Sequence, residues 1–168
     1  MRSSPHRRQF LKSCGAGGAL WGLGNFGFQA PIPGLHAADT VIQPDFVRFS
    51  PEIEPLIRLI EASSRAQLLE KVAQRIKQGT SYREVLTALF LAGVRNIQPR
   101  PVGFKFHAVL VVNSAHLASQ NSPESDRWLP IFWALDYFKS SQARDVAEGK
   151  WTLAAVDEAH VPTAAKAK

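Results

Sequence analysis

The sequence predicts an all-α protein, an irregular bundle of four to five helices that follows an N-terminal export segment. Two observations carry this prediction. Apolar residues recur at spacings of three and four along successive segments between residues 51 and 94, as on one face of a helix. Two of these segments open with a serine placed three residues before Gln or Glu, a pair that is typical of a helix start.

The first predicted helix follows Ser50 and Pro51, which suit a cap and a first-turn proline. The second opens with the capping-box pair Ser64 and Gln67 and stops at Gly79. Their apolar faces are Ile53, Leu56, Ile57 and Ile60 in the first helix and Leu68 or Leu69, Val72, Ala73 and Ile76 in the second.

The third predicted helix begins at a second capping box, Ser81 and Glu84. Residues 82–94 are apolar over most of the helix circumference, so we expect this helix to sit in the core. Residues 95–103 form a connection, because its two prolines cannot continue a helix.

Residues 104–112 are compatible with either a buried strand or part of a longer buried helix. The β-branched Val109, Val111 and Val112 suit a buried strand. The segment continues through residues 113–118 without a turn residue, and no second strand signal exists to pair with it. A longer buried helix is therefore favoured.

The last predicted helix restarts at residues 122–124, and Pro130 either kinks or restarts it. Helical periodicity is lost from Gly149. We expect a helical domain over residues 39–160 and a disordered tail over residues 161–168. The apolar face of the last helix is Ile131, Phe132, Leu135 and Phe138, beside Trp128, Trp133 and Tyr137.

The N-terminus has the layout of a secretory signal, since a basic head without acidic residues leads into an apolar, glycine-rich stretch at residues 14–28. Its sequence resembles the twin-arginine export signal, and departs from that pattern at His6. The resemblance implies export of a folded chain by the twin-arginine translocation machinery to the periplasm or the extracellular space. The residues that carry it are Arg7, Arg8, Phe10, Leu11 and Lys12.

We place signal cleavage after Ala38, give or take several residues, which gives a signal peptide over residues 1–38. The apolar stretch is shorter than the ~20 residues that span a bilayer, so no transmembrane span is expected in the mature chain. Residues 1–38 hold four of the twenty basic residues and none of the fourteen acidic ones. The mature part has a net charge of only +2, which argues against nucleic-acid binding.

Cysteine chemistry is excluded from the mature chain, because Cys14 is the only cysteine and lies within the signal. The candidate polar site is instead His107, Asn113, Ser114 and His116, which interrupt an apolar segment. Nine residues separate His107 from His116, which puts them on roughly opposite faces of a helix, so they cannot both bind one metal. His107 shares a face with Ser114, and Asn113 shares one with His116.

A second polar group, Asp136, Arg144 and Asp145, is explained by surface ion pairs at helical spacing. The tryptophans Trp128 and Trp133, like Trp151, are interpreted as core or interface anchors.

Three segments, residues 89–96, 107–119 and 127–136, resemble a family of uncharacterised twin-arginine-exported helical proteins of planctomycete bacteria. Members of that family are longer, so the resemblance implies that this chain corresponds to an N-terminal portion whose site is shared with a second helical half. A remote likeness to questin oxidase-like proteins implies an oxidoreductase.

Two functions follow as hypotheses. In the first, the chain is a binding or structural module that engages a protein partner or a missing C-terminal half. In the second, it is a metal or cofactor oxidoreductase that depends on His107 or His116 as a ligand or proton carrier. The sequence identifies neither a cofactor nor a catalytic residue.

Overall fold

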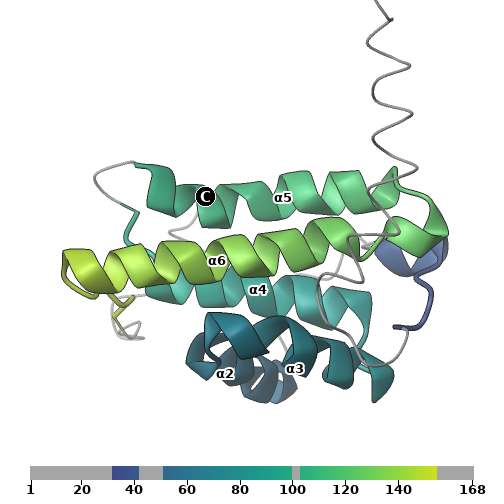
Figure 1. Ribbon diagram of the computed structural model, residues 1–168, viewed down its shortest axis with the longest axis horizontal. Helices are drawn as coiled ribbons and strands as arrows, with labels where there is room; N and C mark the ends of the chain where they lie inside the picture. Colours follow the sequence, from purple (N-terminus) through teal and green to yellow (C-terminus); the bar gives the residue numbers. More distant parts are fainter. Residues whose placement is uncertain (1–31, 42–50, 100–102, 155–168) are drawn as a thin grey trace, which may run out of the picture.

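The computed structural model describes residues 32–41, 51–99 and 103–154. Over these ranges the chain forms five α-helices packed together and no strand, which confirms the all-α prediction (Figure 1). The α-helices are α2 (Glu54–Ala62), α3 (Arg65–Lys77), α4 (Tyr82–Asn96), α5 (His107–Gln120) and α6 (Leu129–Glu148). Short 3-10 helices are η1 (Ala37–Thr40), η2 (Pro51–Ile53), η3 (Phe104–Phe106) and η4 (Glu124–Asp126).

Helix α4 packs against α2, α5 and α6 and so connects the two sides of the bundle. In Figure 1, α5 lies along one edge of the molecule, α2 and α3 lie along the opposite edge, and α6 crosses between them. The expectation that residues 82–94 sit in the core is confirmed. The buried residues of α4 are Tyr82, Val85, Leu86, Ala88, Leu89, Ala92 and Gly93.

The two predicted capping boxes differ. At the start of α4 the box is formed, because Ser81 Oγ accepts from the amide of Glu84 and the Ser81 amide donates to the Glu84 carboxylate at 2.8 Å. At Ser64 no side-chain cap bond is made, so the box predicted there is wrong although α3 begins at the next residue. Gly79 has a φ of +102°, which ends α3 as expected.

Residues 107–120 form a helix, which confirms the helical interpretation over the strand. Pro130 lies in the first turn of α6, so it restarts a helix after the short turn η4. None of the helices in the described ranges is long and apolar enough to span a membrane.

Two predictions lie outside the described residues. These are the export signal, with Arg7, Arg8, Phe10, Leu11 and Lys12, and the tail over residues 161–168. The predicted cleavage site after Ala38 falls inside the described segment 32–41.

Candidate functional site

An open groove of about 300 Å³ lies between α4 and α5. The two helices approach closely beside it, since a Cβ added to Gly93 would lie 3.1 Å from Cγ2 of Val109, a residue that also lines the groove. A glycine at this position therefore sets the spacing of the two helices. The lining residues are Leu86, Thr87, Phe90, Val109, Val112, Asn113 and His116.

Of the polar residues that line the groove, His116 pairs with Tyr82, which lines a separate hollow beside Trp128. The hydroxyl of the buried Tyr82 lies 2.9 Å from Nδ1 of the half-buried His116. Burial lowers the pKa of His116. Burial also raises the pKa of Tyr82, with the nearby Ser119 hydroxyl opposing that change. Both groups are thus neutral near pH 7, and when the tyrosine donates to Nδ1 the imidazole proton is on Nε2.

The four predicted polar residues separate in space. Asn113 and His116 both line the groove, as their shared face predicts. His107, the first residue of α5, and Ser114 are exposed and do not line it. The groove therefore contains half of the candidate polar site.

Sequence reasoning did not pair His116 with Tyr82. Tyr82 and His116 are 34 residues apart, and no local pattern links them. The one available signal is a tyrosine hydroxyl at the start of an otherwise apolar helix, because a buried hydroxyl needs a partner.

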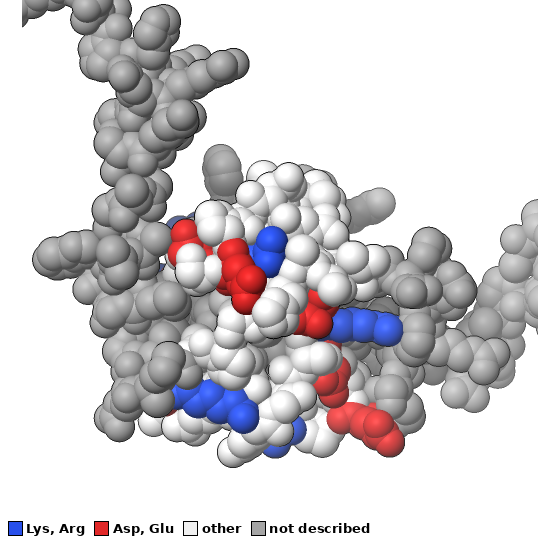
Figure 2. Space-filling model, turned by 90° about the vertical axis from the view of Figure 1, so that its right-hand side faces the viewer, with Lys and Arg blue, Asp and Glu red and all other residues white. Residues whose placement is uncertain are grey.

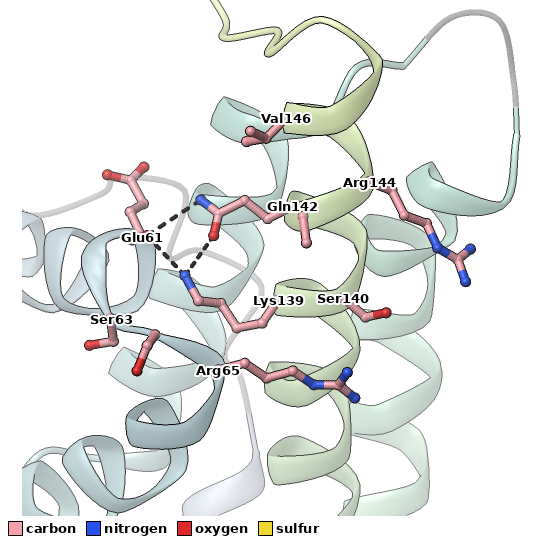
Figure 3. A pocket seen from close by; sticks show the side chains of 10 residues that line it. Glu61, Ser63, Arg65, Lys139, Ser140, Gln142, Arg144 and Val146 are labelled. Atoms are coloured by element: carbon pink, nitrogen blue, oxygen red, sulfur yellow. Dashed lines mark hydrogen bonds between the residues drawn. The ribbon is translucent and has the colours of Figure 1, made fainter.

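A second, more polar hollow of about 600 Å³ lies where the junction of α2 and α3 meets α6 (Figure 3). Lys139 extends into this junction and is 7% exposed. Its Nζ donates to the carbonyl oxygens of Ile60 at 3.0 Å and Glu61 at 2.9 Å, and to Oε1 of Gln142 at 2.6 Å. All three ammonium protons are used at the C-terminal end of α2, so Lys139 stabilises the fold there.

The prediction for the acidic residues of α6 is wrong for Asp145, which is 2% exposed. Burial alone would raise the pKa of this carboxyl, but hydrogen bonds from the amides of Gln98 and Trp151 and from Lys105 outweigh burial and lower the pKa. Asp136 pairs with Arg65 of another helix instead of with a residue on α6. Both carboxylates connect segments that are distant in the sequence.

Trp128, which caps the start of α6, and Trp133, within α6, also differ from one another. Trp128 is buried in the core and its ring centroid lies 5.5 Å from that of Tyr82. Trp133 is half exposed and stacks on Tyr137 at 5.4 Å. The first is a core anchor as predicted, and the second lies on the surface.

The described residues contain no group of three or more His, Cys, Asp or Glu side chains that could hold a metal ion. Figure 2 shows one face of the molecule, on which described basic and acidic side chains are scattered among uncharged ones. Comparison of the chain with protein-family models, with curated proteins and with solved structures gives no match. The resemblance to the planctomycete family therefore stays a prediction.

Proposed function

We propose that this chain is an exported helical binding domain and that it holds its partner in the groove between α4 and α5. The observation that supports this best is that the two helices forming the groove also carry exposed apolar side chains. On α5, Leu110 and Leu117 are 54% and 50% exposed, and on α4 Phe90 is 41% exposed. Clustered exposed apolar side chains mark interaction sites on proteins.

The geometry of α5 favours a helical partner. Leu110, Asn113 and Leu117 follow one another at spacings of three and four, so they form one stripe along the helix. Asn113 also lines the groove, which places the stripe at the edge of the groove. A partner helix laid along this stripe can insert apolar side chains between α4 and α5. A second helical half, which the family resemblance implies, would be one such partner.

Polar groups at the groove can fix the orientation of a bound partner by hydrogen bonding. The amide of Asn113 makes no hydrogen bond within the described part of the chain. His116 uses Nδ1 for Tyr82 and retains Nε2. Both can therefore hydrogen-bond a partner without breaking a bond of this fold.

The binding proposal is tested first with an apolar fluorescent dye, anilinonaphthalene sulfonate, on the purified folded chain. We expect about one dye per chain, and about ten-fold weaker binding after Leu117→Glu combined with Phe90→Glu, because a buried carboxylate is costly. Val146→Glu is the matched control, since Val146 is 54% exposed on α6 away from the groove. A folded wild-type chain that binds no dye would contradict the proposal.

The partner is then sought by placing a photoreactive residue at Leu117 in exported protein, with the same residue at Val146 as control. A specific cross-link from Leu117 to a protein or to a second copy supports a helical partner. A small apolar molecule that co-purifies, and is lost on Leu117→Glu, would instead show that the groove binds a small ligand.

The export proposal is supported by the Arg7-Arg8-Gln9-Phe10-Leu11-Lys12 pattern. Replacing both arginines by lysine should retain the chain in the cytoplasm of a host with an intact twin-arginine route, whereas Arg2→Lys should not. Equal export of the double variant and wild type would refute this part.

The second candidate function, an oxidoreductase, is favoured by one observation. His116 lines an open groove and is hydrogen-bonded to the buried Tyr82, so it could carry a proton. Elemental analysis and an absorption spectrum of exported protein test this idea. A stoichiometric metal or chromophore that is lost in His116→Ala but kept in His107→Ala would support it, and colourless, metal-free protein would count against it.

A further inference from the structure

The segment Ile32–Val41 packs onto the helical bundle. Leu35 is 4% exposed and belongs to the hydrophobic core, and Thr40 is 2% exposed. Helix η1, within this segment, contacts both α4 and α5. Residues that precede the predicted cleavage site thus contribute to the same core as the helices.

Hydrogen bonds hold the backbone of the segment on both sides of Ala38. Nη1 of Arg127 donates to the Leu35 carbonyl at 2.9 Å, before the predicted cut. Nε2 of Gln120 donates to the Thr40 carbonyl at 3.2 Å, after it. These donors come from the end of α5 and from the turn before α6, so the helical domain binds the segment as one piece.

The local conformation at Ala38 is also unsuited to proteolysis. Residues 37–40 form a 3-10 turn, which is closed by hydrogen bonds from the Thr40 hydroxyl to the Ala37 carbonyl and from the His36 amide to the Asp39 carboxylate. A protease needs several residues in extended form, as in strand addition to its active site. Cleavage here would require this turn and the buried Leu35 to leave the domain first.

We infer that Ile32–Val41 is a permanent part of the folded domain, and that the peptide bond cut by a signal peptidase lies on the N-terminal side of Ile32. The second half of this inference rests on the proposed export. A chain that folds before export carries the docked segment across the membrane, so we expect the bond that is cut to precede this segment. The new boundary differs from the cleavage after Ala38 that the small residues of the sequence predict.

The first test uses the full chain produced in a host with an intact twin-arginine route. Intact mass and N-terminal sequencing of the exported product should give a start at Ile32 or earlier. A product that starts at Asp39, or anywhere within residues 33–41, overturns the inference while leaving export intact. A product that stays in the cytoplasm contradicts the export proposal, and the second test then decides the docking on its own.

The second test is limited proteolysis of the purified full chain with a protease of broad specificity, with cut sites read by mass spectrometry. The wild type should resist cutting within residues 32–41, and Leu35→Asp should be cut there about ten-fold faster, because local opening sets the rate. Val41→Asp is the matched control, since Val41 is 63% exposed. Arg127→Ala, which removes the bond to the Leu35 carbonyl, serves if Leu35→Asp fails to fold. Wild type cut within the segment as fast as the variants would overturn the inference.

Discussion

Polar side chains on α6 and polar side chains in the groove between α4 and α5 differ in burial and in hydrogen bonding. On the side of α6 that faces α2 and η3, Lys139 and Asp145 are buried and surrounded by partners from their own chain. In the groove between α4 and α5, His116 and Asn113 border an open hollow and retain hydrogen-bonding capacity. Saturated polar groups fix the fold, whereas groups with remaining capacity at an apolar hollow are available to a partner.

The largest effect is expected at Asp145. Asp145→Ala removes the acceptor of the Gln98 and Trp151 amides and leaves Lys105 without its buried partner. We expect the free energy of unfolding to fall by about 3 kcal/mol, because donors are left buried and unsatisfied. Urea unfolding measures this change, with Glu148→Ala as control, since Glu148 binds the same lysine from an exposed position. If Asp145→Ala and Glu148→Ala lowered the free energy of unfolding equally, burial of Asp145 would not be what makes it important to the fold.

Lys139 should follow with a smaller effect. Lys139→Met keeps most of the aliphatic stem but removes the three donated hydrogen bonds at the end of α2. The free energy of unfolding should fall by about 2 kcal/mol, since two helix carbonyls lose their partner. Lys77→Met, at an exposed position in the last turn of α3, should change it little. Hydrogen exchange at the end of α2 would localise the loss.

For His116, which lines the groove, we expect a modest pH dependence of the free energy of unfolding. Burial lowers the pKa of His116 in the folded state, so below the unfolded value of about 6.5 the unfolded chain takes up a proton that the folded chain resists. The contribution of His116 to stability is therefore present above this pH and is lost as the pH falls through it toward the folded pKa. His116→Gln should flatten the change in unfolding free energy between pH 7 and pH 5, which urea unfolding at the two pH values measures.

The smallest effect on stability belongs to Asn113. Asn113→Ala should change the free energy of unfolding by less than about 0.5 kcal/mol, because the exposed amide makes no bond within the described fold. The same change should weaken binding of the partner identified from Leu117 by a few-fold, since an interface hydrogen bond is lost. If Asn113→Ala lowered the stability and left binding unchanged, Asn113 would serve the fold, as Lys139 and Asp145 do, and would not serve partner binding.

Local chemistry explains why parts of this fold were predictable. The box at Ser81 and Glu84 and the stop at Gly79 involve residues within one helical turn of each other, so spacing alone predicts them. The failed box at Ser64 shows the limit of this reasoning. Helix α3 begins there without a side-chain cap, and its buried face packs into the core.

Contacts between distant segments could not be predicted in the same way. Asp136 and Asp145 lie on one helix, and helical spacing suggested surface pairs for both. Their partners instead come from α3, from residues 98 and 105, and from the chain after α6. Neither pairing has a sequence signal, because a charged side chain can bind whichever opposite charge the tertiary fold brings near.

The sequence by itself determined the helical class, the placement of α4 in the core and the shared face of Asn113 and His116, because apolar periodicity and helical spacing are local properties. Only the tertiary structure decided that Tyr82 pairs with His116, that Lys139 and Asp145 are internal, and that Leu35 is a core residue. The physical reason is that burial depends on which surfaces meet, and chain segments far apart in the sequence supply those surfaces.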